Sequence, residues 1–296
     1  MVLAVITLAV ACSTRTPDSE PLEWNPGDAR VSYLGPEGTY TEEATQLVFP
    51  DSAVLVPRAT VPDAIADVVS GASDYAVIPQ ENTIGGPVTA YVDALIAEQA
   101  VFVVGEVIIP ISQTLMGLPG ASLSDIRLVC SHAQGLAQSA QWLGENLPEA
   151  ETVEKSSTAA AASFVAESGD GGIAAIAAPG AAKLYGLEVL AENVQISDSN
   201  RTRFYILSAN AREGEGLTNA VLVATCGADM VDDVIIEISR CGLELVSIHD
   251  RPEGSRLGSY HFIMEVNDPD GIGVDVLRRL ESLSDVRLLG SFNVVR

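Results

Sequence analysis

The sequence predicts an α/β protein with two lobes in its main body and a smaller C-terminal unit of β-α-β-β-α-β order. Short apolar strands alternate with helical segments between about residues 31 and 208, which is typical of sheets covered by helices. After a linker at 210–217, which contains Gly214 and Gly216, this pattern changes. A chain of 296 residues with 47% apolar side chains is also long enough for two domains.

The main body is expected to contain eight strands that lie in parallel sheets. They are placed at 31–34, 53–56, 75–78, 101–109, 126–130, 151–154, 173–177 and 202–208. The extended run 101–117 and the return at 188–206 are interpreted as two crossovers between lobes. The first lobe is therefore expected to be discontinuous in sequence.

Three junctions between a strand and a helix are rich in polar residues. At 33–44 a Gly/Pro turn leads to Thr39 and a helix whose exposed N–H groups favour an anion. At 77–87 a strand runs into a polar loop, and Pro87 suits the first turn of a helix at 87–97. At 129–138 Ser131 is a candidate helix cap, and Gln138 follows two turns later.

A fourth polar segment, 192–204, brings hydroxyl, amide and guanidinium groups to the point where an apolar strand resumes. Alone it fits either a small-anion site or a polar loop before an edge strand. Ligands of open α/β sheets bind beyond the strand ends, so the four segments together indicate one shared pocket.

The C-terminal unit has the element order of a ferredoxin-like fold. The expected elements are strand 218–225, helix 229–241, strand 243–250, strand 258–267, helix 270–282 and strand 285–295. Asp229 is expected to be the N-cap of the first of these helices.

Charge and cysteine content exclude several classes of function. The formal net charge of −24 disfavours nucleic acid and anionic membranes as partners. A pocket for an anion must therefore be locally positive, and with Lys155 and Lys183 as the only lysines, arginines and helix N-termini must supply that field. The four cysteines form no C-x-x-C pair and the three histidines are scattered, so no metal site is expected and a reduced compartment is favoured.

The N-terminal residues 1–28 are interpreted as a flexible extension. The apolar run that ends at Cys12 loosely resembles a lipoprotein signal, but no Lys or Arg precedes it and it is short. We therefore expect a cytoplasmic protein, with export or a lipid anchor at Cys12 as the alternative.

The four polar segments, together with 156–161 and 184–187, closely resemble the prephenate dehydratase family in order and spacing. The resemblance covers about residues 31–209 and implies a catalytic domain at 29–210 with two lobes, similar to a type 2 periplasmic-binding-protein fold. It also implies conversion of prephenate to phenylpyruvate in phenylalanine biosynthesis, with loss of CO2 and water and without a cofactor.

Carried over by position, the resemblance implies that Thr202 is the catalytic hydroxyl. Threonine has no acidic pKa, so a neighbour must polarise it, and Glu81 and Arg203 are the candidates. The substrate-binding residues implied are Thr39, Asn82, Thr83, Ser131, Gln138 and Arg203. Four of these have a structural alternative: a capped turn for Asn82 and Thr83, a solvated helix face for Gln138, and an ion pair at the crossover for Arg203. His132 is interpreted as a helix-boundary residue.

Residues 217–296 resemble the ACT regulatory domain, in which paired copies bind an amino acid, usually phenylalanine in this family. The chain departs from the family at both ligand motifs. It has Asp229-Met230-Val231 in place of Gly-Ala-Leu, and His249-Asp250-Arg251-Pro252 in place of Glu-Ser-Arg-Pro. The tentative effector residues are Asp229, His249, Asp250 and Arg251, and regulation by phenylalanine stays open.

Other functions remain open from the sequence. Gln80, which precedes Glu81, leaves arogenate possible as the substrate. A two-lobed protein that binds a small acid without chemistry, or a sensor that works through its ACT domain, are further alternatives. The family resemblance leads us to expect a homodimer or homotetramer.

Overall fold

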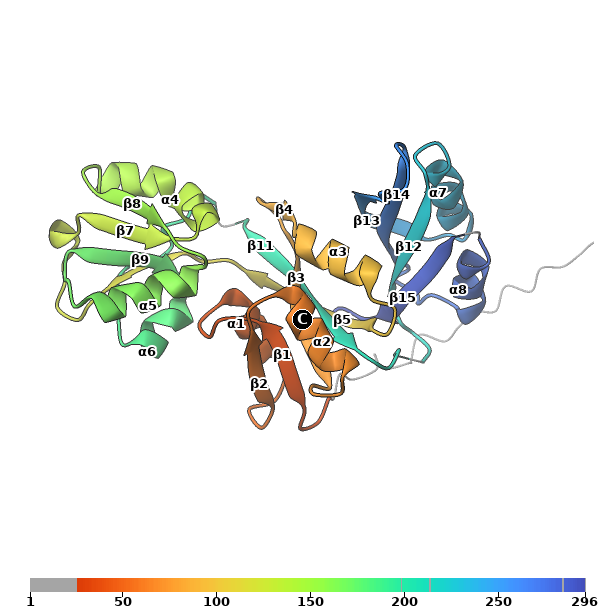
Figure 1. Cartoon of the computed structure of the whole chain (residues 1–296), viewed down its shortest axis with the longest axis horizontal. Helices are drawn as coiled ribbons and strands as arrows, with labels where there is room; N and C mark the ends of the chain where they lie inside the picture. Colours follow the sequence, from red (N-terminus) through yellow and green to blue (C-terminus); the bar gives the residue numbers. More distant parts are fainter. Residues whose placement is uncertain (1–25, 198, 213, 284, 296) are drawn as a thin grey trace, which may run out of the picture.

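The computed structural model describes residues 26–197, 199–212, 214–283 and 285–295. Most of the expected extension 1–28, including Cys12, lies outside the described residues. The described chain forms three β-sheets with helices packed against them (Figure 1). None of the described helices is long and apolar enough to cross a membrane.

The first sheet has the order β2-β1-β3-β11-β5, with the short strand β4 paired to β3. Its strands are β1 (Arg30–Leu34), β2 (Val54–Arg58), β3 (Tyr75–Asn82), β4 (Gly86–Pro87), β5 (Phe102–Pro110) and β11 (Arg201–Ser208). Its helices are α1 (Tyr40–Val48), α2 (Val61–Val69) and α3 (Thr89–Ala97). We call this unit lobe 1.

The second sheet has the order β10-β6-β9-β7-β8 and forms lobe 2, at the left in Figure 1. Its strands are β6 (Thr114–Gly117), β7 (Leu128–Ser131), β8 (Glu151–Glu154), β9 (Ile173–Ala177) and β10 (Glu188–Ala191). The 3-10 helix η1 (Leu123–Asp125) precedes β7, and the α-helices are α4 (Ala133–Asn146), α5 (Thr158–Ser168) and α6 (Pro179–Tyr185).

Two extended connections join the lobes, as the sequence predicted. The chain leaves lobe 1 after β5 and enters lobe 2 at β6, then leaves lobe 2 after β10 and returns to lobe 1 as β11. The expectation of parallel sheets was wrong for the strands that carry these connections. Because it comes back from the other lobe, β11 runs antiparallel to both β3 and β5, and β6 runs antiparallel to β9 and β10.

The C-terminal domain is a four-stranded antiparallel sheet of order β13-β14-β12-β15 with two helices, at the right in Figure 1. Its elements are β12 (Asn219–Gly227), α7 (Val231–Arg240), β13 (Glu244–Pro252), β14 (Ser259–Asn267), α8 (Val274–Glu281) and β15 (Val286–Phe292). The predicted β-α-β-β-α-β order is present. Met230 is the N-cap of α7, so the assignment of Asp229 as its cap was wrong.

The C-terminal domain shares a hydrophobic core with lobe 1. Val221, Ile263 and Phe292 of the C-terminal sheet belong to the same buried cluster as Tyr91 of α3 and Tyr205 of β11. The ring of Tyr205 packs edge-on against Tyr91 and Phe292, each with centroids 5.9 Å apart. The C-terminal domain therefore covers the face of β11 from which the Tyr205 side chain projects.

Local capping explains where several helices begin. Thr39 and Ser157 accept hydrogen bonds from backbone N–H groups in the first turns of α1 and α5. Two expected starts were wrong. Pro87 pairs in β4, so α3 begins at Thr89, and Ser131 ends strand β7, so His132 rather than Ser131 caps α4.

Candidate active site

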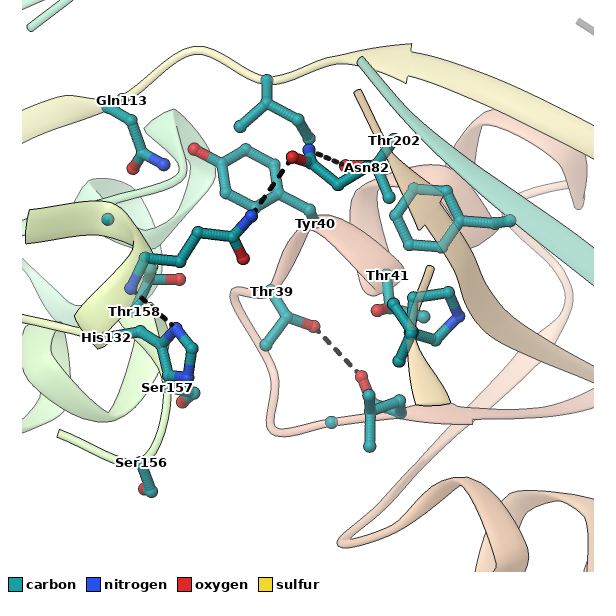
Figure 2. A pocket seen from close by; sticks show the side chains of 18 of the residues that line it. Thr39, Tyr40, Thr41, Asn82, Gln113, His132, Ser156, Ser157, Thr158 and Thr202 are labelled. Atoms are coloured by element: carbon teal, nitrogen blue, oxygen red, sulfur yellow. Dashed lines mark hydrogen bonds between the residues drawn. The ribbon is translucent and has the colours of Figure 1, made fainter. Parts of the chain in front are cut away.

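A polar cavity of about 410 Å³ lies between lobe 1 and lobe 2. Residues of both lobes line it: Thr39, Tyr40, Thr41, Asn82, Gln113, His132, Gln134, Gln138, Ser156, Ser157, Thr158 and Thr202 contribute polar groups. Figure 2 shows His132 and Ser156–Thr158 on the lobe 2 side, facing Thr39 and Thr41 on the lobe 1 side, with Asn82 and Thr202 of lobe 1 above them. Of the predicted site residues, this cavity brings together Thr39, Asn82, Gln138 and Thr202.

Asn82 holds Thr202 in a defined orientation. The two residues are direct partners in the antiparallel pairing of β3 and β11, so their side chains lie on the same face of the sheet. The Asn82 Nδ2 donates to Thr202 Oγ1 at 2.9 Å and to Asn200 Oδ1 at 2.8 Å. Asn82 Oδ1 accepts from the backbone N of Gly85 at 2.8 Å, which fixes which end of the amide faces Thr202.

The oxygen of the Thr202 hydroxyl therefore accepts a hydrogen bond within the protein, and its proton is available for donation to a ligand. Across 26–197, 199–212, 214–283 and 285–295, no acceptor takes the proton of this hydroxyl. Accepting a hydrogen bond also polarises an O–H group and strengthens it as a donor. The side chain that hydrogen-bonds to the Thr202 hydroxyl is thus Asn82, and not Glu81 or Arg203, which were the candidates from the sequence.

A chain of amides extends this arrangement across the lobes. Asn200 Nδ2 donates to Gln138 Oε1 at 3.0 Å, and Gln113 Nε2 donates to the same oxygen at 3.2 Å. Gln134 of α4 donates to Asn82 Oδ1 at 3.1 Å, so lobe 2 contacts the Asn82 amide of lobe 1 directly. Gln138 is buried in this network, which excludes the solvated helix face considered for it.

Sequence reasoning missed Gln113, Gln134 and Asn200. Gln113 and Asn200 lie in the connections between the lobes; Asn200 falls within the polar segment 192–204, but no role of its own was predicted for it. In the sequence, only the i, i+4 spacing of Gln134 and Gln138 could have indicated that their side chains lie on the same face of a helix. His132, interpreted as a boundary residue, is both the cap of α4 and part of the cavity wall.

Three predicted binding residues have other contacts. Ser131 is fully buried and donates to the backbone oxygen of Ile176 at 2.7 Å, so it supports the lobe 2 sheet. Thr83 is exposed, and its hydroxyl accepts from the backbone N of Arg201 at 3.0 Å and donates to the backbone O of Ser199 at 3.3 Å. Arg203 faces away from the cavity, as described below.

Glu81 and Arg203 pair on the face of the sheet opposite to Asn82 and Thr202. Arg203 Nη2 lies 2.9 Å from Glu106 Oε2 and 2.9 Å from Glu265 Oε1, and its Nη1 lies 3.8 Å from Glu81 Oε2. His249 Nε2 lies 3.8 Å from Glu81 Oε1. We call these five residues the interdomain charge cluster. The proposed roles of Glu81 in polarising Thr202 and of Arg203 in binding a carboxylate do not fit these positions.

Burial sets the protonation behaviour of the cluster. Glu106 is fully buried, and burial together with the charge of Glu265 raises its pKa to about 7 against the opposing effect of Arg203. Burial alone would lower the pKa of Arg203, but Glu265 and Glu106 outweigh it, so the pKa lies above its ordinary value. Burial lowers the pKa of His249. The charge of Glu81 raises this pKa but offsets the effect of burial only in part.

Replacing Glu106 with glutamine is expected to flatten the pH dependence of stability. Arg203 and Tyr205 of β11, Glu81 of β3 and Glu265 of β14 face this carboxyl group. Its pKa rises from 4.5 to about 7 on folding, so between these values the folded protein binds more protons than the unfolded chain. The free energy of unfolding therefore falls as the pH rises through this range and levels off above it.

Urea unfolding at about pH 5 and about pH 8 checks this prediction. Glutamine does not titrate, so the Glu106→Gln variant should lose less stability than the wild type between these two pH values. The same loss in both proteins would contradict the assignment. His249 titrates in both proteins, and Glu106 is not among the groups that shift its pKa, so the comparison of the two proteins removes the contribution of His249.

Two of the four tentative effector residues contact lobe 1. His249 hydrogen-bonds to the Tyr91 hydroxyl, and Arg251 Nη2 donates to Asp93 Oδ2 at 3.0 Å, so both connect β13 to helix α3 of lobe 1. Asp250 points to the other face of β13, and Asp229 lies in the turn before α7.

Among the described residues no group of three or more His, Cys, Asp or Glu could hold a metal ion.

The fold and the cavity define a two-lobed α/β protein with a polar site for a small ligand between its lobes. A family model described as prephenate dehydratase matches residues 31–212. The prephenate dehydratase of Mycolicibacterium gilvum is 32% identical over 283 residues, covering 88% of this chain and 90% of that protein. The bifunctional chorismate mutase/prephenate dehydratase of Neisseria gonorrhoeae is 35% identical over 267 residues, covering 88% and 74%. The chain belongs to the prephenate dehydratase family.

Solved structures share the whole arrangement. The prephenate dehydratase of Arthrobacter aurescens in complex with L-Phe has a TM-score of 0.80 at 32% identity, covering 90% of each chain. GqqA, described as a novel type of quorum quenching acylase, has a TM-score of 0.78 at 27% identity, covering 90% of this chain and 98% of that one.

Proposed function

We propose that the protein converts prephenate to phenylpyruvate, CO2 and water. The observation that supports this best is the Thr202 hydroxyl, which accepts a hydrogen bond from Asn82 and has a proton available to a ligand in the cavity. As the ring carboxylate leaves as CO2, its bonding electrons move into the ring and expel the ring hydroxyl. Thr202 donates a hydrogen bond to this departing oxygen, which takes up one proton supplied by the solvent and leaves as water. Aromatisation supplies the driving force, so donors and orientation suffice.

Helix N-termini supply the positive field that a dianion needs. Thr39 and Ser157 cap helices α1 and α5, and His132 caps α4, and all three line the cavity. Each terminus stabilises a nearby anion by roughly 0.3–1 kcal/mol. This explains how the cavity can bind two carboxylates although Arg203 faces the other way.

Prephenate is favoured over arogenate by the surroundings of Gln80. Its side chain is fully buried and donates to the Tyr205 hydroxyl at 3.3 Å, on the side of the interdomain charge cluster. Glu81 lies on that side too, so neither residue offers the cavity a carboxylate for the amino group of arogenate.

Acyl transfer, suggested by the likeness to GqqA, fits the site less well. A threonine nucleophile needs a base that accepts its proton. Within the described ranges the Thr202 hydroxyl meets the Asn82 amide donor and no such base.

We further propose that the C-terminal domain is an ACT domain and that the protein forms a homodimer or homotetramer. The βαββαβ order and the likeness to the complex with L-Phe support a regulatory role. His249 and Arg251 already contact α3, so a phenylalanine site would have to rely on Asp229, Asp250 and neighbouring groups.

Initial rates of product formation from prephenate and from arogenate test this proposal, each with and without added phenylalanine. We expect phenylpyruvate from prephenate and at most slow turnover of arogenate. Faster turnover of arogenate would overturn the choice of substrate, and unchanged rates with phenylalanine would overturn regulation by that amino acid.

A further inference from the structure

The residue after Thr202 connects the active-site strand to the C-terminal domain. Along β11 successive side chains point to opposite faces, so Thr202 and Phe204 face the cavity while Arg203 and Tyr205 face the C-terminal sheet. A residue of that sheet can therefore act on Thr202 through one backbone link.

Glu265 of β14 is the residue in that position. It is fully buried and accepts from Arg203 Nη2 at 2.9 Å, from Tyr205 Oη at 2.8 Å and from Asn219 Nδ2 at 3.1 Å. Two of these donors belong to β11 and the third to β12 of the C-terminal domain. The Glu265 carboxylate thus connects the side chains of Arg203 and Tyr205, on one face of β11, to the C-terminal sheet.

The other carboxylates of the interdomain charge cluster belong to lobe 1, so neither links Arg203 to the C-terminal domain. Glu106 lies in β5, beside β11 in the same sheet, and Glu81 is 3.8 Å from the guanidinium. Neither oxygen of Glu106 accepts a well-directed hydrogen bond from the described residues. Buried charged hydrogen bonds with defined geometry restrict orientation, and losing one partner leaves the other unpaired.

We infer that Glu265 is a positioning residue for the dehydration: it acts through Arg203 and Tyr205 to hold the Thr202 hydroxyl in the cavity. The C-terminal domain then contributes to turnover in the absence of any effector and without touching the substrate. This inference rests on the proposed function of Thr202.

The Glu265→Gln variant of the full-length protein tests the inference through separate kcat and KM values for prephenate. A misplaced catalytic group lowers the rate of the chemical step more than binding, so we expect kcat to fall at least about tenfold and KM to change less than about twofold. Glu237→Gln is the matched control, because it breaks a contact to Arg279 within the same domain, away from β11. Its kcat should equal that of the wild type.

A double-mutant cycle distinguishes positioning from general destabilisation. If Glu265 acts through Arg203, adding Glu265→Gln to Arg203→Gln should lower kcat little further. The inference would be overturned if the double variant lost kcat by the product of the two single losses. It would also be overturned if the substitutions changed KM alone.

Tyr205→Phe provides a test that does not require removal of a charge. It deletes the hydrogen bond to Glu265 and the longer one from Gln80 Nε2, and it keeps the ring that packs against Tyr91 and Phe292. We expect a fall in kcat of about two- to fivefold at unchanged KM, whereas an unchanged kcat would overturn the inference. A wild type that forms no phenylpyruvate would instead contradict the proposed function itself.

Discussion

The Thr202→Ala variant should lose about 10²- to 10³-fold in kcat for prephenate, while KM changes by less than about threefold. The hydroxyl donates to the oxygen that leaves, and this hydrogen bond becomes stronger as negative charge develops on that oxygen. Substrate binding depends mainly on the helix N-termini and the amides of the cavity, which the substitution leaves in place. Steady-state kinetics of phenylpyruvate formation measure both constants.

The fold should tolerate this change. Without Thr202 Oγ1, Asn82 Nδ2 still has Asn200 Oδ1 at 2.8 Å and the backbone O of Arg201 at 3.1 Å as acceptors. We expect a loss of about 1 kcal/mol in the free energy of unfolding. Thr202→Ser keeps the hydroxyl and serves as the control, with most of the activity retained. Equal kcat values for the alanine variant and the wild type would remove Thr202 from the mechanism.

The Asn82→Asp variant is expected to lower kcat about 10²-fold, although Thr202 is unchanged. Aspartate replaces the Nδ2 donor with a carboxylate oxygen that only accepts hydrogen bonds. The Thr202 hydroxyl would then donate to this carboxylate, 2.9 Å away in the wild-type arrangement, and would no longer donate to the substrate. The added negative charge also opposes binding of a dianion, so KM should rise as well.

Asn146→Asp makes the same chemical change at the end of α4, where the Asn146 Nδ2 donates to the backbone oxygen of Trp142 at 2.9 Å and the side chain is exposed. Its kcat and KM should match the wild type. If Asn82→Asp retained normal turnover, the hydrogen bond from Asn82 could not be what orients and polarises Thr202. Glu81→Gln and Arg203→Gln would then have to be compared, because Glu81 and Arg203 were the two candidates from the sequence.

The ends of the strands were the most predictable part of the site. Thr39, Asn82, Gln138 and Thr202 lie in one cavity because polar residues at strand ends and helix starts of an α/β protein converge there. The two crossovers could also be predicted, since the extended run 101–117 and the return at 188–206 are too long for strands of one small sheet.

The orientation of Glu81 and Arg203 follows from a rule that the sequence already allowed us to apply. Side chains alternate along a strand, so if Thr202 faces the cavity, Arg203 must face away from it. What the sequence could not supply is the partner on that side. Glu265 is more than sixty positions from Arg203 in the chain, and no local pattern indicates that the C-terminal sheet covers β11.

The amides at the lobe connections and the start of α3 depended on long-range pairing. β3 continues through Gln80 to Asn82 because β11 returns beside it, and Pro87 is held in β4 by its pairing with Glu81. The local sequence alone predicts a loop after the strand at 75–78 and a helix that starts at Pro87. Asn200 is buried only because both connections pass the cavity at this point.

Single-turnover formation of phenylpyruvate, with enzyme in excess over prephenate, tests most directly whether Thr202 is the catalytic donor of a prephenate dehydratase. Measured side by side, the wild type should convert the bound prephenate, and Thr202→Ala should bind it with similar affinity and convert it about 10²-fold or more slowly. A wild type that binds prephenate without forming phenylpyruvate, or an alanine variant that converts it at the wild-type rate, would contradict the account.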